Sequence, residues 1–175
     1  MTALIPLLLA SACSPIDDRV PMFGESGDAF EPCQPNADGK LNIVIDGDTL
    51  DLSDGTRVRL LGLDTPEVYD VEEPECFGPE ASDFVKEALD DVEDLELGFD
   101  EVCTDAHGRT LAYVWFNEVV DEGDEPDRIF LNELILREGY ASFYELDVEL
   151  RRRETLLAAE AEAIAEGKGL HGACE

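Results

Sequence analysis

Basic residues are scarce in this chain of 175 residues. Lys and Arg together number 12, against 43 Asp and Glu, so the formal net charge is −31 at pH 7. Such charge is typical either of a disordered chain or of a protein adapted to a salty medium, where screening removes self-repulsion. The periodic apolar segments described below favour the second interpretation. The charge by itself argues against a polyanionic partner.

Long apolar runs are also missing, since no run reaches the roughly 18–20 residues that a membrane-spanning helix needs. A shorter apolar stretch at residues 4–10 leads through two small residues to Cys13. This arrangement resembles a bacterial lipoprotein signal, which is cut before a cysteine that is then acylated. No Lys or Arg precedes the stretch, so an ordinary cleaved signal or a frayed apolar terminus stays open.

From this terminus we expect an exported protein. Residues 1–13 are predicted to be the signal segment, with Cys13 as the lipidation site. The mature chain would then be a bacterial cell envelope lipoprotein, membrane-anchored and extracytoplasmic, or a secreted protein. Residues 14–40 are rich in Pro, Gly, Asp and Glu without periodicity, which predicts an acidic tether before a domain at 41–175.

Within the predicted domain, short β-branched segments begin at Leu41 and are separated by Asp-Gly turns, which indicates β-hairpins. Two further strands are predicted around residues 95–100 and 110–116. A helix begins at Pro79, and two more are predicted at 129–138 and about 146–166. Five strands and about three helices predict an α+β fold built on a small β-barrel.

Two acidic motifs carry the candidate chemistry, IDGDT at residues 45–49 and RLLGLDTPE at residues 59–67. They place Asp46, Asp48, Asp64 and Glu67 at strand ends and turns, where side chains can converge. Clustered carboxylate oxygens suit calcium or magnesium better than zinc. The alternative is that the first motif only makes a turn and the second only caps the next helix.

Two arginines accompany these acids. Arg59 lies on a strand that leads into the acidic cluster, and Arg109 follows a Gly turn in DAHGRTLAYVW. A guanidinium fork matches two phosphate oxygens, and two forks with a divalent cation could neutralise the transition state of phosphoryl chemistry. The alternative is that both arginines are surface ion-pair partners.

The order of five segments resembles the thermonuclease (staphylococcal nuclease-like) family over roughly residues 41–171. These segments are IDGDT, RLLGLDTPE, CFGPEAS, DAHGRTLAY and LNELILREGYA. The resemblance implies a five-stranded OB-fold β-barrel and assigns the motif residues. Asp48, Asp64 and the Thr65 carbonyl would bind calcium, Asp46 would support them, Glu67 would be the general base, and Arg59 and Arg109 would hold the phosphate.

The resemblance also implies a function. The chain would be a calcium-dependent endonuclease that hydrolyses phosphodiester bonds of DNA and/or RNA and leaves 3′-phosphates. We expect a monomer whose partner is nucleic acid and whose membrane contact is the lipid anchor alone. Ala106 and His107 replace the Lys-Tyr pair of the best-known members, so His107 is a candidate substrate contact, or simply an exposed turn histidine. The alternative function is a non-catalytic OB-fold binding module of the cell envelope.

Four cysteines remain after Cys13, an even number that indicates two disulfides in an exported protein, with three possible connectivities. Their spacing matches no zinc site. We predict the pair Cys76–Cys103, because both residues flank the proposed site, and the pair Cys33–Cys174, which would join the tether to the C-terminal tail.

The shortage of basic residues predicts an unusual response to salt. A protein that binds phosphates through many Lys and Arg side chains loses affinity steeply as salt rises. Here the acidic surface instead repels a polyanion, over a Debye length that shrinks from about 30 Å at 0.01 M to about 3 Å at 1 M salt. We expect kcat/KM for nucleic acid cleavage to rise to an optimum at several hundred millimolar salt. In a salt titration at saturating calcium, a monotonic fall would show that the local field of the site dominates.

Overall fold

The computed structural model describes residue 33 and residues 36–69, 72–118, 125–146 and 149–174. They lie in the unit that runs from Pro32 to Glu175. The predicted signal segment, with its Cys13 lipidation site, lies outside the described residues, as does most of the predicted tether. No helix in the described ranges combines the length and the apolar character needed to cross a bilayer.

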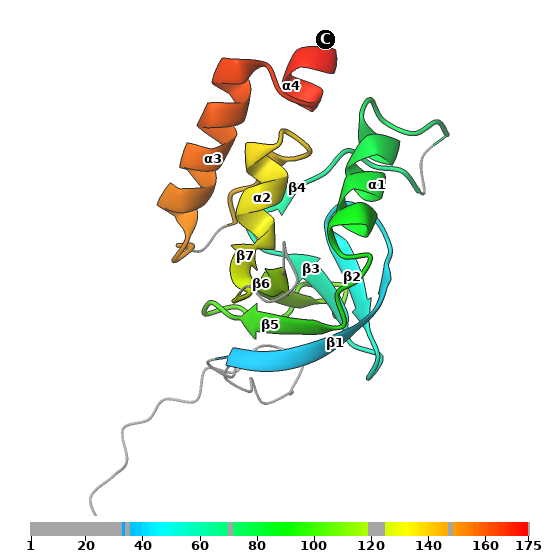
Figure 1. Cartoon of the computed structure of the whole chain (residues 1–175), viewed down its shortest axis with the longest axis vertical. Helices are drawn as coiled ribbons and strands as arrows, with labels where there is room; N and C mark the ends of the chain where they lie inside the picture. The colour runs from blue at the N-terminus through cyan, green and yellow to red at the C-terminus, as the bar shows by residue number, and fades with distance from the viewer. Residues whose placement is uncertain (1–32, 34–35, 70–71, 119–124, 147–148, 175) are drawn as a thin grey trace, which may run out of the picture. The chain divides into compact units, whose positions relative to one another are not determined.

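Five strands form a closed barrel (Figure 1): β1 (Asn36–Val44), β2 (Thr49–Leu52), β3 (Arg57–Leu60), β5 (Asp94–Gly98) and β6 (Thr110–Glu118). The order β3-β2-β1-β5-β6 is antiparallel throughout, and parallel pairing of β3 with β6 closes the ring. Closure leaves no edge strand within the barrel. The predicted α+β fold on a five-stranded OB barrel is therefore confirmed.

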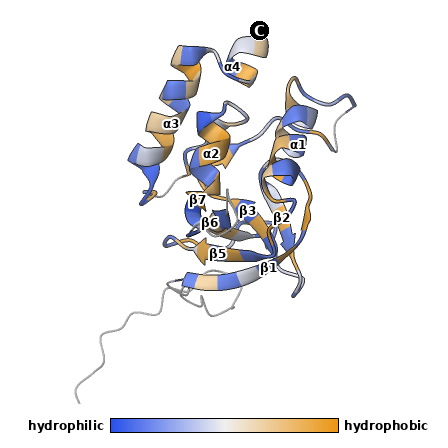
Figure 2. Cartoon of the chain, in the orientation of Figure 1, coloured by the Kyte–Doolittle hydropathy of each residue, from blue (hydrophilic) through white to orange (hydrophobic). Residues whose placement is uncertain are grey.

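Short strands and helices complete the unit. Strand β7 (Asp127–Phe130) pairs with β6, and β4 (Leu63–Asp64) pairs with β8 (Ser142–Phe143). The helices are α1 (Gly78–Ala88), α2 (Leu131–Arg137), α3 (Arg153–Glu166) and the four-residue α4 (Leu170–Ala173). Hydrophilic and hydrophobic residues interleave along strands and helices (Figure 2). The first predicted helix is confirmed as α1, and the apolar residues Ala81, Val85 and, at its C-terminal end, Leu89 are buried.

The first strand begins earlier than predicted. Strand β1 starts at Asn36, which pairs with Gly98 of β5. The predicted boundary at Leu41 therefore lies inside a strand, and the last residues of the predicted tether belong to the barrel. The Pro/Gly-rich composition of this segment does not predict a strand. The strand forms because the segment pairs with β5, which is distant in sequence.

The second predicted helix, 129–138, begins later than expected. Its first two residues, Ile129 and Phe130, belong to β7 and pair with Phe116 and Trp115. The Phe130 ring stacks on Trp115 with centroids 4.8 Å apart. This cross-strand contact holds the two residues extended.

The third predicted helix, 146–166, also begins later, because side chains of the barrel bind the backbone ahead of it. The Arg151 N–H donates to the Asp100 carboxylate at 3.1 Å, and the Arg152 N–H donates to the Tyr113 hydroxyl at 3.4 Å. Apolar periodicity cannot reveal such long-range acceptors. The predicted end of this helix at residue 166 is confirmed, since Gly167 ends α3 in the left-handed conformation.

Both predicted disulfide pairings are wrong. The structure joins Cys33 to Cys103 and Cys76 to Cys174, with Cα–Cα distances of 5.4 and 5.9 Å. Antiparallel pairing of β1 with β5 brings the residue before β1 to the segment that follows β5, which explains the first bridge. In the entropic model, loops of this length (separations 70 and 98) give about 4–5 kcal/mol of stabilisation each.

One buried amide ties α2 to the barrel. Asn132 accepts a hydrogen bond from the Val114 N–H at 2.9 Å and donates one to the Leu61 carbonyl at 2.9 Å. Asn132 is fully buried. Its removal would leave two backbone groups without partners.

We therefore expect Asn132→Ala to destabilise the fold by about 3 kcal/mol, since each unsatisfied buried group costs about 1–3 kcal/mol. Asn117→Ala, at an exposed position of β6, is the matched control and should change stability by less than about 0.5 kcal/mol. Chemical denaturation measures both. Equal effects of the two substitutions would contradict this role of Asn132.

Candidate active site

The turn between β1 and β2 presents Asp48 inside the protein. This side chain is 2% exposed, and its Oδ2 accepts hydrogen bonds from the Thr65 N–H and hydroxyl, both at 3.0 Å. The Thr49 hydroxyl donates to Oδ1 at 3.0 Å, and the Asp48 N–H donates to Asp46 Oδ1 at 3.1 Å. A Cβ on Gly47 would lie 2.7 Å from Thr65 Cγ2, so only glycine permits this approach.

Arg59 joins the two acidic motifs. Pairing of β3 with β2 sets Arg59 opposite Thr49, directly beside Asp48. Its guanidinium forms ion pairs with Asp48 and with Asp64, the latter at 2.5 Å, and also donates to the Leu63 carbonyl at 3.2 Å. Only 14% of the Arg59 side chain is exposed. Both predicted carboxylate ligands therefore lie against one fixed cation.

Arg109 is held by Asp105 in the turn before β6. The Asp105 carboxylate accepts the Arg109 backbone N–H at 2.9 Å, the Arg109 Nε at 2.6 Å and the His107 backbone N–H at 2.9 Å. Burial alone would raise the pKa of Asp105, but these hydrogen bonds hold it below its usual value. Asp105 was not among the predicted site residues, although its four-residue spacing from Arg109 is compatible with such a turn.

Barrel closure brings the two arginines to one cavity. Arg59 pairs with Leu111, two residues beyond Arg109. Fourteen residues line a cavity of about 450 Å³, and five of them are predicted site residues: Arg59, Asp64, Glu67, His107 and Arg109. The remaining predicted site residues, Asp46, Asp48 and Thr65, do not line this cavity. Asp48 contacts Arg59, and Asp46 and Thr65 are hydrogen-bonded to Asp48.

The acids around this cavity outweigh the cations. The pKa of Glu67 is raised, first by partial burial and then by the charges of Asp46 and Asp64. Burial also raises the pKa of Asp46, although its hydrogen bonds with Thr49 and the nearby charges of Arg59 and Arg109 oppose that rise. A bound cation would offset the acidic charges that contribute to the raised pKa of Glu67.

The donor atoms fit a hard cation in particular. In the part of the chain that the structure describes, no group of three or more His, Cys, Asp or Glu residues could hold a metal ion by itself. The set implied by the resemblance has two carboxylates, Asp48 and Asp64, and the Thr65 carbonyl. These are all oxygen donors, as calcium prefers. Both carboxylates contact the same guanidinium, so their spacing is compatible with a shared ligand.

Two residues of the cavity, Tyr144 and Leu146, come from outside the motifs that the sequence singled out. Pairing of β8 with β4 places Phe143 opposite Leu63, and the Tyr144 N–H donates to the Gly62 carbonyl at 3.2 Å. Tyr144 is 50% exposed and offers an aromatic face beside the arginines. No local pattern marks these residues, because a two-residue strand pairing brings them to the site.

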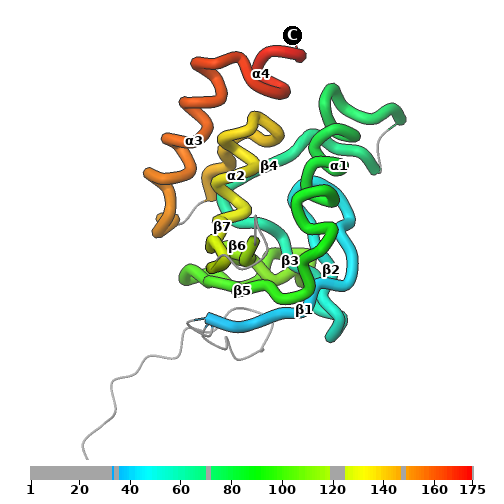
Figure 3. Tube along the Cα trace, viewed as in Figure 1, coloured from blue at the N-terminus to red at the C-terminus, as the bar shows by residue number. Residues whose placement is uncertain are grey.

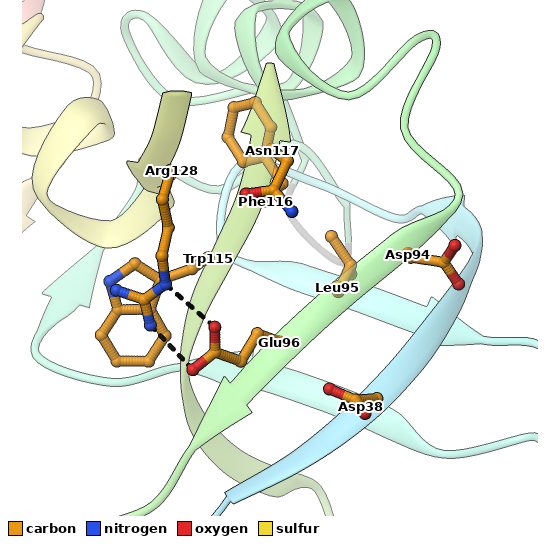
Figure 4. Close-up of a pocket in the computed structure, with 8 residues that line it drawn as sticks. All are labelled: Asp38, Asp94, Leu95, Glu96, Trp115, Phe116, Asn117 and Arg128. Carbon is orange, nitrogen blue, oxygen red and sulfur yellow. Dashed lines mark hydrogen bonds and ion pairs between the residues drawn. The ribbon is translucent and has the colours of Figure 1, made fainter. Parts of the chain in front are cut away.

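A second cavity, of about 300 Å³, contains none of the predicted site residues (Figure 4). Arg128 lies over the Trp115 ring, 4.5 Å from its centroid, and forms two hydrogen bonds with Glu96 at 2.8 and 2.9 Å. Lys40 pairs in turn with Asp94 at 2.9 Å. These opposite charges neutralise each other, which argues against chemistry here.

A family model described as staphylococcal nuclease homologue matches residues 57–172, well over half of the chain. The chain belongs to this family. The matched range includes Arg59, Asp64, Glu67 and Arg109, and it begins after Asp48. Membership in the staphylococcal nuclease family agrees with the closed barrel and with the clustering of these side chains in one cavity.

Curated relatives of this family member include nucleases. The chain is 36% identical to a thermonuclease of Staphylococcus hyicus over 116 residues, which cover 63% of the chain and 62% of the relative. It is 41% identical to a thermonuclease of Staphylococcus intermedius over 102 residues, covering 56% and 54%. An endonuclease of Bacillus subtilis is 28% identical over 128 residues, covering 65% of the chain and 10% of the relative. The chain thus spans less than two thirds of each of these relatives.

The hydrogen bonds of Asp48 lead to a stability prediction. Thr65→Val keeps the side-chain shape but removes one donor to a buried carboxylate, so it should destabilise the fold by about 1.5–3 kcal/mol. Thr155→Val, at an exposed position of α3, makes the same chemical change and should have little effect. Thermal or chemical unfolding compares the two variants. Equal effects would show that the Thr65 hydroxyl does not hold Asp48.

Proposed function

We propose that this chain is a calcium-dependent nuclease that hydrolyses phosphodiester bonds of DNA and/or RNA and leaves 3′-phosphates. The observation that carries the proposal is the convergence of Arg59, Arg109, Asp64 and Glu67 on one cavity. These groups can neutralise a phosphate, support a cation and accept a proton. The thermonuclease and endonuclease relatives support the same activity.

Calcium would be held by Asp48, Asp64 and the Thr65 carbonyl. Asp46 would support this set by fixing the Asp48 backbone through its hydrogen bond. When bound, calcium would supply electrostatic stabilisation of the phosphate charge and a template for the substrate. The raised pKa of Glu67 supports the proposal, because it is due to partial burial and also to the charges of Asp46 and Asp64, which a cation would offset.

The chain's own residues would carry the remaining steps. Arg59 and Arg109 would donate hydrogen bonds to non-bridging phosphate oxygens and would stabilise the additional negative charge of the transition state. Glu67 would orient the attacking water and accept its proton as the P–O bond forms. The bond from phosphorus to the 5′ oxygen then breaks in line, and the 5′ oxygen takes a proton from solvent.

Substrate contacts outside the phosphate would come from the rim of the cavity. Tyr144 offers a ring on which a base can stack, and such stacking is tolerant of sequence. His107 lines the same cavity and is the other candidate contact. We propose a monomer that acts on nucleic acid without a protein partner.

We also propose that the protein acts outside the cytoplasm, either lipid-anchored at Cys13 in the cell envelope or secreted. Two disulfides support this location, because disulfides form and persist in oxidising compartments. The membrane contact would be the lipid anchor alone.

The proposal is tested by incubating the full chain with plasmid DNA and with RNA, in calcium or in excess chelator. Arg59→Lys, Arg109→Lys and Glu67→Gln should each lower kcat by about 10²–10³. Asp48→Ala and Asp64→Ala should raise the calcium concentration needed for half-maximal rate. Digestion that continues undiminished in chelator would exclude the calcium role.

Arg57→Lys is the matched control, because Arg57 lies on the same strand as Arg59 but pairs with Asp51 at 2.7 Å. It does not line the cavity. This variant should keep its rate within about twofold. Near-wild-type rates in all three catalytic variants would instead favour a non-catalytic OB-fold binding module.

A further inference from the structure

The segment that carries Glu67 connects β4 to α1 and contains no regular secondary structure among its described residues (Figure 3). Its backbone must therefore be held by other contacts. The Glu67 N–H donates to Glu75 Oε2 at 3.0 Å, and the Glu67 carbonyl accepts the Glu75 N–H at 2.8 Å. One residue thus binds both backbone polar groups of the proposed general base.

The first residue of α1, Gly78, packs closely against the same segment. A Cβ on Gly78 would lie 2.9 Å from the Glu67 carbonyl oxygen and 3.0 Å from that of Pro66. Glu75 and Gly78 therefore contact Glu67 from both sides of Cys76. A contact that fixes the position of Cys76 therefore also fixes Glu75 and Gly78, the two residues that hold Glu67.

Cys76 is fixed by its disulfide to Cys174, at the end of α4. This short helix is itself anchored to the end of α2. The Leu170 N–H donates to the Gly139 carbonyl at 2.8 Å, and a Cβ on Gly169 would lie 2.1 Å from that oxygen. The backbones of Gly169 and Gly139 are therefore in direct contact, and α2 is packed in the core through its buried residues. The bridge therefore connects the Glu67 segment to the core through α4 and α2.

The bridge also lies beside the proposed calcium ligands. A cavity of about 310 Å³ is lined by both cysteines and by Asp64, Thr65 and Glu75. The bridge therefore lies next to the groups whose relative placement the chemistry requires. The other disulfide, Cys33–Cys103, joins different segments.

We propose that Glu75 and the Cys76–Cys174 disulfide are positioning groups that hold Glu67 in its catalytic place. The proposal rests on the proposed nuclease function. Neither group touches the substrate. Their effect is on the backbone of Glu67 and therefore on the distance between its carboxylate and the attacking water.

The test uses the full oxidised chain and a variant with Cys76→Ser and Cys174→Ser, assayed with single-stranded DNA well below the measured unfolding temperature of each. Displacement of a positioned group by about 1 Å can cost about 10² in rate. We expect kcat to fall between about tenfold and a hundredfold. KM should stay within about twofold, because the two phosphate-binding arginines lie on other segments, Arg59 in β3 and Arg109 just before β6.

The matched control is Cys33→Ser with Cys103→Ser, which removes a cross-link of similar loop length. Both pairs should lower the unfolding temperature, but this one should leave kcat within about twofold. At Glu75, a glutamine keeps an oxygen acceptor for the Glu67 N–H and an alanine does not. Glu75→Gln should therefore lose less of kcat than Glu75→Ala.

A double-mutant cycle shows whether the bridge acts through Glu67. In a Glu67→Gln background, loss of the bridge should lower kcat by less than about twofold, because coupled residues are not additive. A full additional loss in that background would overturn the proposal. So would a bridge-free variant that cleaves as fast as wild type, and this result would leave the nuclease function standing. Wild-type protein that cleaves neither DNA nor RNA would overturn both.

Discussion

The parallel pairing of β3 with β6 is the constraint on which the site depends. The two strands are far apart in sequence; Arg59 lies within β3, and Arg109 comes immediately before β6. Their pairing closes the barrel and places Arg59 opposite Leu111, close to Arg109. Asn132 supports the same junction, since it binds the backbone of β6 and the backbone just beyond β3. An open sheet would keep every strand but would separate the two cations.

Electrostatic pairing then fixes the groups that closure brings together. Each arginine of the site is held by nearby carboxylates, Arg59 by Asp48 and Asp64, and Arg109 by Asp105. Burying a carboxylate such as Asp48 is unfavourable unless its oxygens are hydrogen-bonded. The donors from Thr49, Thr65 and Arg59 meet that requirement. The result is a preorganised set of charges, which is the condition for electrostatic stabilisation of a transition state.

Local patterns predicted much of this molecule. Burial of Ala81, Val85 and Leu89 follows from helical spacing, and the end of α3 follows from Gly167. The acidic motifs and arginines were identified because turn chemistry and residue type are visible in a short window. Family resemblance assigned roles to them, and the structure brings Arg59, Asp64, Glu67 and Arg109 to one cavity.

The failures share a different cause, since each depends on a contact between distant segments. The pairing of Cys33 with Cys103 requires the β1–β5 register, and the late start of α3 requires acceptors on the barrel. Tyr144 reaches the site through a two-residue strand. Composition and periodicity do not encode these pairings, so they could be found only from the three-dimensional structure.

The strongly negative charge of the chain explains why these long-range contacts matter for the proposed function. A basic nuclease can gather its substrate through many cations and counterion release, and loose placement of one group matters less for binding. With 12 cations against 43 acids, this chain has little attraction of that kind to offer. Its proposed chemistry must therefore rely on a few groups held in fixed positions.

Disulfides add rigidity to the site without adding charge. They therefore suit an acidic protein, in which further lysines or arginines would reduce the negative charge of the surface. A bridge beside Asp64 and Glu75 is where such rigidity has the greatest effect on the reacting groups.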